Sequence, residues 1–389
     1  MSDTKQAPAG ALHGCKVIDL SRVLGGPYCT QILADHGAEV YKVEPPGGDE
    51  TRGWGPPFLE GTASYFLGVN RNKYGLSLDL SKPEGQAFLR AMLADADVLV
   101  ENFKPGTLEK WGLSVDVLQR DYPRLVHCRI SGFGAEGPLG GLPGYDACAQ
   151  AMCGLMSVNG EADGEPTRVG LPVVDMVTGL NAALAILLAI NERHRSNKGQ
   201  FLDITLFDCA ISLLHPHAAN YFLSGNVPQR TGNAHPNIAP YESFPTADGD
   251  IFLAVGNNRQ FELLMTQLER PELVDDARFQ SNAARLQNRQ ALRNILADLL
   301  ARHVAADLAQ TLLKKGVPAA PVLNVEQLLQ HPHTRHREMV LEDGDYRAIA
   351  SPIKLSRTPA SLRRPPPAFG QHNDQVAKAV GLPLEPEEG

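Results

Sequence analysis

One acidic residue, Asp175, interrupts an apolar stretch in the segment LPVVDMVTGL, which runs from Leu171 to Leu180. The apolar residues 169–174 are predicted to form a strand, and a long helix is predicted to follow. An aspartate at such a junction is typical of a helix N-cap, because its carboxylate accepts hydrogen bonds from the first backbone amides. The same amides would hold the carboxylate ionised, so the position also suits a carboxylate nucleophile.

The histidines do not indicate a metal site. The motif HPH occurs at residues 215–217 and again at 331–333, with His336 close behind. Two histidines around one proline cannot share a helix face, and no cysteine or carboxylate stands at ligand spacing beside them. The sequence also lacks a G-x-S-x-G motif, and Cys153 opens an apolar stretch typical of a core thiol. We therefore expect no metal and no serine or cysteine nucleophile.

Basic residues lie at or near the ends of several of the predicted strands. A parallel sheet would bring these positions to one edge, where they could hold a polyphosphate ligand in an otherwise acidic protein. Ordinary solvated side chains are the alternative interpretation. The candidates are Arg22, Lys42, Arg52, Arg71, Lys73, Lys104 and Lys110.

The elements that must position these residues alternate between strand and helix. Apolar runs at 15–20, 39–43, 74–80, 97–103 and 125–133 predict strands, with helical patterns between them. This order is typical of an open, doubly wound (Rossmann-like) parallel sheet, in which ligands bind beyond the carboxyl ends of the strands. No G-x-G-x-x-G motif follows the first strand; the turn there reads SRVLGGP.

Composition limits the class of protein. The chain has 389 residues, a net charge of −8 and six cysteines without a C-x-x-C pair. The acidic balance argues against a general nucleic-acid or membrane-surface role, and the cysteines suggest reduced thiols in a cytoplasmic protein. The N-terminus shows no secretion signal, and the apolar run 176–190 is short for a membrane span.

The length of the chain and the change in its amino-acid composition after residue 222 predict two domains. A segment rich in glycine, proline and asparagine follows residue 222, and a Pro-rich tail closes the chain. We expect a large α/β domain from residues 1–222 and 331–389, and a smaller inserted α+β domain at 223–330.

Several blocks of the sequence resemble the family III CoA-transferases, the family of formyl-CoA transferase and carnitine CoA-transferase. The resemblance extends from Leu12 to about Val340. The blocks that carry it are LSRVLGGPYCTQILADHGAEVYKVE, VNRNKYGLSLDL, ADVLVENFKPGTLEKWGL, ISGFGAEGPLGGLPGYDACAQAMCGL, VGLPVVDMVTGL and ERHRSNKGQFLDITLFD.

The resemblance implies a function and a site. The family is built as an interlocked homodimer and transfers CoA from an acyl-CoA to a carboxylic acid through aspartyl anhydride and aspartyl-CoA thioester intermediates, without a metal or redox cofactor. Its catalytic aspartate matches Asp175, and Tyr145 and Asp146 match residues near the reacting carboxylate. The positions similar to its CoA-binding residues are Arg22, Val23, Leu24, Gly25, Leu78, Asn102, Phe103 and Lys110.

Departures from formyl-CoA transferase bear on the substrate. This chain has Leu24 and Pro45 where that enzyme has a glutamine and a basic residue, and its Gly-rich loop is absent near residues 232–244. The sequence is more similar to members that use succinyl-CoA and a small dicarboxylate, so we expect a C4–C6 dicarboxylate. Arg52 and Arg168 are candidates for its remote carboxylate, since arginine offers a planar fork.

Two alternatives remain open from the sequence. An α-methylacyl-CoA racemase shares the fold, but racemases of that group show GHD where this chain has GYD, with Tyr145 in the histidine position. A non-catalytic CoA-binding protein is the other alternative, and the presence of Asp175 argues against it.

Overall fold

Contacts divide the computed structural model into two compact units, each described here by itself. The structure describes residues 10–383, so residues 1–9, which belong to the segment expected to carry no secretion signal, lie outside it. Within the described chain, unit 1 comprises residues 10–155, 169–215 and 333–383, and unit 2 comprises residues 156–168 and 216–332. The sequence-based boundaries kept 156–168 in the larger domain. In the structure this segment joins unit 2, where the amide of Gly232 donates to the carbonyl of Gly160.

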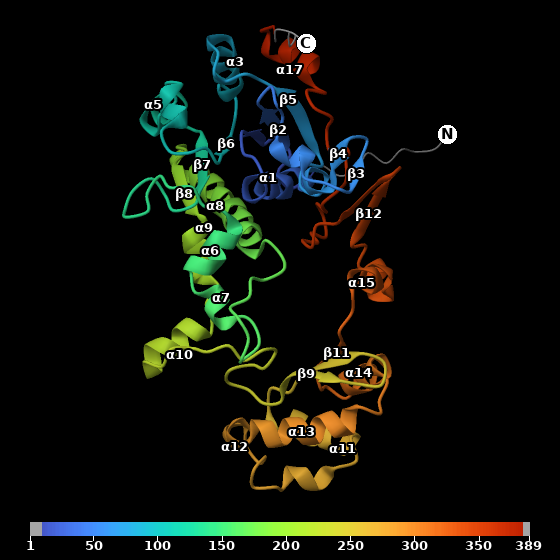
Figure 1. Ribbon diagram of the computed structural model, residues 1–389. Coiled ribbons are helices and arrows are strands. Elements are labelled where there is room, and N and C mark those ends of the chain that lie inside the picture. Colours follow the sequence, from blue (N-terminus) through green and yellow to red (C-terminus); the bar gives the residue numbers. More distant parts are fainter. Residues whose placement is uncertain (1–9, 384–389) are drawn as a thin grey trace, which may run out of the picture. The chain divides into compact units, whose positions relative to one another are not determined.

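The centre of unit 1 is a six-stranded parallel sheet with the order β5-β2-β1-β6-β7-β8 (Figure 1). This confirms the predicted α/β class. The chain moves from β1 outward in one direction and from β6 outward in the other, so the switch point lies between the carboxyl ends of β1 and β6. The strands are β1 Lys16–Asp19, β2 Glu39–Glu44, β5 Lys73–Ser77, β6 Val98–Glu101, β7 Val126–Ser131 and β8 Phe201–Thr205.

Helices cover both faces of this sheet. Successive side chains of a strand point to opposite faces, and the core divides accordingly. Val17 packs in one cluster with Ile186 of α8 (Val173–Ser196), and Ile18 packs in the other with Phe88 of α3 (Pro83–Leu93). Helix α1 (Gly25–Asp35) lies on the α8 face, and α17 (Asn373–Val380) contacts α3 and β5.

Helix α8 is the longest helix of the described chain, and by length and composition alone it could cross a membrane. Core helices of globular proteins pass the same test. One face of α8 is buried in unit 1, with Val174, Ala182 and Ile186 inaccessible to solvent. Its other face is apolar and exposed, and it carries Leu180, Leu184, Leu187 and Leu188.

Residues 350–372 of unit 1 return along the sheet edge without regular structure. Arg363 donates to the carbonyls of Ala34 and Ala38, and Arg364 stacks on Tyr74 at 3.7 Å. The Pro-rich tail therefore lies on a surface, as its composition predicted. The remaining elements of this unit are β3 Phe58–Leu59, β4 Thr62–Ala63, α2 Ser64–Leu67, α4 Thr107–Lys110, α5 Val115–Asp121, α6 Asp146–Met152, α9 Leu206–Ser212, α16 Pro332–His336, β12 Val340–Asp343 and β13 Tyr346–Ile349, with the short 3-10 turn Glu50–Gly53.

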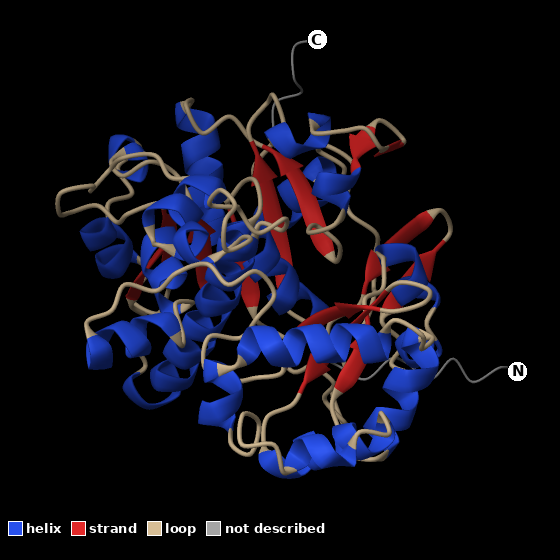
Figure 2. Ribbon diagram, turned by 60° about the horizontal axis from the view of Figure 1, so that its bottom comes forward, coloured by secondary structure: helices blue, strands red, loops and turns tan. Residues whose placement is uncertain are grey.

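Unit 2 has its own core between helices and a three-stranded antiparallel sheet of order β11-β10-β9. Figure 2 shows strands flanked by helices in both parts of the chain. The strands are β9 Tyr241–Pro245, β10 Asp250–Ala254 and β11 Ala319–Pro321. The helices are α10 His217–Ser224, α11 Asn258–Gln267, α12 Asn282–Gln287, α13 Arg289–Leu300, α14 Ala305–Lys314 and α15 Val325–Gln330, and α7 (Leu155–Val158) begins at the boundary between the units.

Candidate active site

Asp175 lies inside the first turn of α8, and the strand predicted before it does not form. The helix begins at Val173, so Asp175 is its third residue rather than its cap. The prediction of a strand at 169–174 is wrong because this segment pairs with no strand; the amide of Val169 donates to the side chain of Gln150 at 2.9 Å. Pro172 then leads into the helix.

The cap of α8 comes from Asp146, the first residue of α6. One carboxylate oxygen of Asp146 accepts from the amides of Val174 and Asp175, at 2.8 and 3.1 Å. The other oxygen accepts from Gln150 at 2.6 Å, and Gln150 is fully buried. The capping role assigned locally to Asp175 therefore belongs to Asp146, a residue far upstream in the sequence, and the carboxylate of Asp175 is left for another purpose.

Burial raises the pKa of Asp175 to about 7, and the neighbouring carboxylate of Asp146 adds to this rise. The sequence had suggested that helix-start amides would hold Asp175 ionised. Two of those amides donate to Asp146 instead, and they bring a second negative charge close to Asp175. A carboxyl group with this pKa is roughly half ionised at neutral pH, which keeps it both nucleophilic and easily neutralised.

Tyr65 on α2 is electrostatically coupled to the same pair of acids. Burial and the charges of Asp175 and Asp146 raise the pKa of Tyr65 to about 12, so its hydroxyl stays protonated. The ring of Trp54 packs edge-on against Tyr65, with centroids 5.2 Å apart. The sequence analysis did not single out these aromatic residues. Only the fold brings their segment, between β2 and β5, close to the start of α8.

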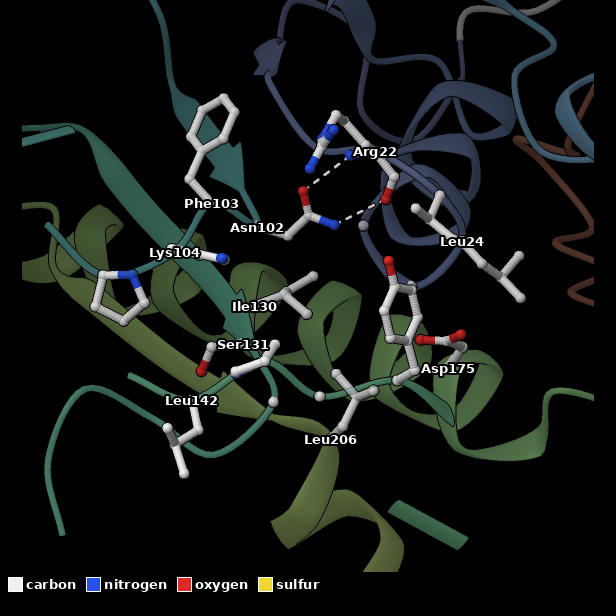
Figure 3. Close-up of a pocket in the computed structure, with 18 of the residues that line it drawn as sticks. Arg22, Leu24, Asn102, Phe103, Lys104, Ile130, Ser131, Leu142, Asp175 and Leu206 are labelled. Atoms are coloured by element: carbon white, nitrogen blue, oxygen red, sulfur yellow. Dashed lines mark hydrogen bonds between the residues drawn. The ribbon is translucent and has the colours of Figure 1, made fainter. Parts of the chain in front are cut away.

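A pocket of unit 1 opens at the switch point of the sheet, with Asp175 in its wall (Figure 3). In the view of Figure 3, Phe103 and Asp175 lie on opposite sides of this space. Its walls come from the segments after β1, β6 and β7 and from the start of α9. The lining residues are Arg22, Val23, Leu24, Gly25, Gly26, Glu50, Asn102, Phe103, Lys104, Pro105, Ile130, Ser131, Gly132, Leu142, Pro143, Gly144, Tyr145, Asp175 and Leu206.

The turn after β1 is fastened across the switch point. The amide of Arg22 donates to Asn102 at 2.9 Å, and the side chain of Asn102 donates back to the carbonyl of Arg22 at 2.7 Å (Figure 3). Helix α1 then begins at Gly25, beside Asp175. A Cβ atom at Gly25 would lie 3.5 Å from a carboxylate oxygen of Asp175, in ordinary van der Waals contact, so the start of α1 packs directly beside this acid.

The predicted cluster of cations forms only in part. Arg22 and Lys104 line the pocket, and Arg22 lies 3.8 Å from Glu50 in a loose ion pair. The other candidates are not at the pocket. Acidic partners inside the protein occupy Lys42 (Asp49), Lys73 (Asp19), Arg71 (Asp35) and Arg52 (Glu44).

Most of the positions expected to bind CoA are brought together. Six of them line the pocket: Arg22, Val23, Leu24, Gly25, Asn102 and Phe103. Leu78 does not, because its side chain is buried in the hydrophobic core, and Lys110 lies exposed at the end of α4, outside the lining. Of the residues near the reacting carboxylate, Tyr145 lines the pocket and Asp146 caps α8.

The two arginines considered for a substrate carboxylate have different surroundings. Arg52 holds Glu44 with two hydrogen bonds of 2.7 and 2.8 Å and stacks on Phe66, so its planar fork is already used. The suggestion that Arg52 binds a substrate carboxylate is corrected on this ground. Arg168 belongs to unit 2 and does not line the pocket of unit 1.

The pocket also contains residues that the sequence analysis did not assign. Ser131 and Gly132 end β7, and Leu142 to Gly144 form the loop before Tyr145. The sequence could have pointed to Ser131 and Gly132, because the carboxyl ends of parallel strands meet at one edge, and this rule applies to β7 as much as to β1 and β6. Among residues 10–383, no group of three or more histidine, cysteine, aspartate or glutamate side chains could hold a metal ion.

Comparisons with known proteins agree with this geometry. The family model described as CoA-transferase family III matches residues 12–373. Succinate–glutarate CoA-transferase of Agrobacterium fabrum is 41% identical over 377 residues, covering 94% of each chain. Succinyl-CoA:mesaconate CoA-transferase of Haloarcula hispanica is 38% identical, covering 96% of this chain and 97% of that protein. The crystal structure of a CAIB/BAIF family protein from Brucella suis matches with a TM-score of 0.87 and 41% identity, over 96% of this chain and all of the other.

Proposed function

Because this chain belongs to CoA-transferase family III and is therefore an enzyme, we propose that it moves CoA from succinyl-CoA to a C4–C6 dicarboxylate, with Asp175 as the covalent nucleophile. The observation that carries this proposal is the carboxylate of Asp175 in the wall of a pocket at the sheet's switch point. Asp175 is partly buried, it does not cap α8, and its pKa is raised to about 7. Asp146 takes the capping role, which leaves the Asp175 carboxylate available for chemistry.

The first half of the proposed reaction loads the enzyme. The Asp175 carboxylate attacks the thioester carbonyl of succinyl-CoA, forming an aspartyl–succinyl anhydride and expelling the CoA thiolate. The thiolate then attacks the aspartyl carbonyl of the anhydride. This step forms an aspartyl-CoA thioester and releases succinate, so both atoms and charge balance.

The second half transfers CoA to the acceptor. The acceptor carboxylate attacks the aspartyl-CoA thioester, giving a second anhydride and the CoA thiolate again. The thiolate attacks the acceptor's acyl carbon, which releases the new acyl-CoA and regenerates the Asp175 carboxylate. Each step passes through an oxyanion that needs donors already aimed at it. Since Asp146 accepts from the Val174 and Asp175 amides, we assign this task to the amides of Gly25 and Gly26.

CoA fits the pocket by its chemistry. Arg22 and Lys104 offer positive charge for its phosphates at the pocket wall, and the buried Nε atom of Arg22 has no hydrogen-bond partner among residues 10–383. Phe103, Ile130 and Leu142 offer apolar surface for the pantetheine arm. The thiol end would then point toward Asp175, across the space from Phe103.

The acceptor class is inferred from the relatives. The names of these enzymes pair glutarate with succinate and mesaconate with succinyl-CoA, and both acids are small dicarboxylates. The second carboxylate of such an acid needs a cation or several donors. With Arg52 held by Glu44, Arg168 is the candidate that remains for this contact.

A second copy of the chain is part of the proposal. The exposed leucines of α8, Leu180, Leu184, Leu187 and Leu188, form an apolar stripe on the helix that carries Asp175. A stripe of this kind is unfavourable in water and typical of a subunit interface. We assign it to the interlocked homodimer that the family resemblance implies. A covered site would also protect the anhydrides from water.

A substrate panel tests this function. The purified protein is incubated with succinyl-CoA and one acid at a time, and new acyl-CoA is measured by chromatography. We expect transfer to glutarate, mesaconate and related C4–C6 dicarboxylates, with much weaker transfer to monocarboxylates of matched length. Transfer only to monocarboxylates would overturn the substrate class, and no transfer from any acyl-CoA would overturn the activity.

A further inference from the structure

Val23, in the turn between β1 and α1, has a left-handed backbone with φ of 69°. A left-handed conformation is costly for a β-branched residue, because its Cβ atom crowds the backbone. Such a conformation persists only where the surroundings determine it, and it is often found at functional sites. The neighbours of Val23 show what imposes it.

Buried charges hold the chain before Val23. The side chain of Lys42 donates to the carbonyl of Ser21, and the carboxylate of Asp19 accepts from the Ser21 amide at 3.0 Å. Ser21, Lys42 and Asp19 are all fully buried. Gly26 closes the turn from the other end, since a Cβ atom there would lie 2.3 Å from the Ser21 side chain. The turn therefore has little freedom on either side of Val23.

Asn102 holds Arg22, the residue between Ser21 and Val23, through the peptide groups on both sides of it. Its amide side chain accepts from the Arg22 amide and donates to the Arg22 carbonyl, as a paired contact. Figure 3 shows this pair at the rim of the pocket. Both polar atoms of the Asn102 side chain are thus used on the protein backbone. This differs from the role suggested by sequence, which was contact with CoA.

The chain after Val23 leads directly to the reactive acid. Two residues later Gly25 lies beside the Asp175 carboxylate, and a Cβ atom at Gly179 of α8 would lie 2.6 Å from the Gly25 carbonyl. Helices α1 and α8 are therefore in close backbone contact at this point. A rotation of the Arg22 or Val23 peptide would shift Gly25 and the amides that we assign to the oxyanion.

We propose that Asn102 is a positioning residue, which holds Val23 in its left-handed conformation and thereby fixes the Gly25 backbone beside Asp175. The effect on catalysis rests on the proposed function above. The effect on the backbone does not, because it follows from the two hydrogen bonds and the φ angle of Val23. Asn102 thus acts through the turn rather than on the substrate.

A glycine rescue tests this proposal. Asn102→Ala removes both hydrogen bonds and should lower kcat/KM for succinyl-CoA by about tenfold to a hundredfold. Val23→Gly supplies a residue that adopts positive φ freely. We expect the double variant Val23→Gly/Asn102→Ala to recover to within about threefold of Val23→Gly alone. Leu24→Gly in the Asn102→Ala background is the matched control, and it should not rescue, because φ at Leu24 is −136°.

Losses that multiply in the Val23→Gly/Asn102→Ala variant would overturn the proposal, since they are the result expected if Asn102 contacts CoA directly. Amide hydrogen exchange of residues 21–26 supplies a readout that needs no acyl-CoA. Exchange should quicken in Asn102→Ala and return toward the Val23→Gly rate in the double variant. Unchanged amide exchange in Asn102→Ala also contradicts the proposed positioning role of Asn102, whatever reaction the enzyme performs.

Two further outcomes are decisive. If the wild-type enzyme shows no transferase activity but the variants show the predicted exchange pattern, the proposed function is refuted and the positioning role of Asn102 is retained. If Asn102→Ala does not fold, folding of Val23→Gly/Asn102→Ala is itself the rescue. Failure of both variants to fold counts against the proposal.

Discussion

The end of β1 and the first turn of α8 each carry an aspartate, and the two carboxylates behave in opposite ways. Asp19 is fully buried, yet it accepts from Ser21 and Thr30 and pairs with Lys73 at 3.0 Å. Burial alone would raise its pKa, but Lys73, Lys42 and these hydrogen bonds outweigh burial and hold the pKa of Asp19 below its usual range. Asp175 has no such partners in the described part of the chain, so burial raises its pKa to about 7, and the neighbouring carboxylate of Asp146 adds to the rise.

Partners, rather than burial itself, decide which acid serves structure and which is available for chemistry. Cations and hydroxyl donors stabilise ionised Asp19, so it anchors the turn that leads to Val23. Asp175 is buried beside another acid, so its anion is held in a relatively unstable state that favours reaction with an electrophilic carbonyl. The turn after β1 leads from Asp19 to Gly25, and Gly25 lies beside Asp175 at the start of α8. The two acids are therefore linked through this turn.

The largest effect is expected from removing the reactive acid. Asp175→Ala should lower kcat by roughly 10⁴-fold or more, because a covalent pathway has no substitute nucleophile. Asp116→Ala is the matched control, since Asp116 is an exposed acid in the first turn of α5, and it should keep activity within about twofold. Steady-state transfer from succinyl-CoA is the measurement. Near-normal turnover by Asp175→Ala would show that Asp175 is not the nucleophile, so the proposed difference in role between Asp175 and Asp19 would be wrong.

The buried anchor should matter for stability instead. Lys73→Met removes one cation from Asp19 and leaves a charge without its partner, so we expect a loss of about 3–5 kcal/mol in the free energy of unfolding. Lys82→Met, at an exposed lysine before α3, should change stability by less than about 0.5 kcal/mol. Denaturant unfolding measures both variants. Equal effects from the two would show that the cluster at Asp19 is not an anchor.

A pH series separates the two acids by sign. The folded-state pKa of Asp175 is raised, so the folded protein keeps this proton between about pH 4 and 7 while the unfolded chain loses it, and stability falls as pH rises through that window. Asp175→Asn should therefore be more stable than wild type by roughly 2–4 kcal/mol at pH 8 and by little at pH 4. Asp19 has a lowered pKa, so its stabilisation is present above the ordinary carboxyl pKa and is lost as pH falls. A stability gain in Asp175→Asn that does not vary with pH would contradict the raised pKa.

The smallest effect concerns the contact between the two regions. Gly25→Ala adds a methyl group 3.5 Å from the carboxylate of Asp175, and we expect about a tenfold loss in kcat with little change in stability. Gly47→Ala is the matched control, because a Cβ atom there meets nothing within 4 Å. Thermal unfolding and initial rates measure the pair. Similar rates for both variants would show that the approach of α1 to Asp175 has no role.

Local sequence patterns predicted the sheet but not the start of α8. Alternating apolar runs were sufficient for the parallel strands, because each run carries its own periodicity. The run 169–174 is equally apolar, yet it forms no strand. The amide of Val169 donates to the side chain of Gln150, and the helix begins at Val173. The cap that decides this, Asp146, lies far upstream, and no local rule connects it with α8.

The same limit applies to the charges. Arg52 follows β2, Lys42 lies within β2 and Lys73 begins β5, and only the structure shows that acids within the protein occupy all three. Local patterns could place a basic residue at a strand end but not its partner on another strand or loop. Conversely, Asp175 was recognised through family resemblance, while its pKa depends on burial and on Asp146, which are properties of the assembled fold.

The most direct test of the central claim is a covalent trap at Asp175. The enzyme is incubated with succinyl-CoA at pH 7 and quenched with hydroxylamine, which converts an aspartyl anhydride or thioester into a hydroxamate, and the peptides are mapped by mass spectrometry. We expect the hydroxamate on Asp175, dependent on succinyl-CoA and absent from Asp175→Asn. Modification of another carboxylate, or an active enzyme that never carries the label at Asp175, would contradict the account.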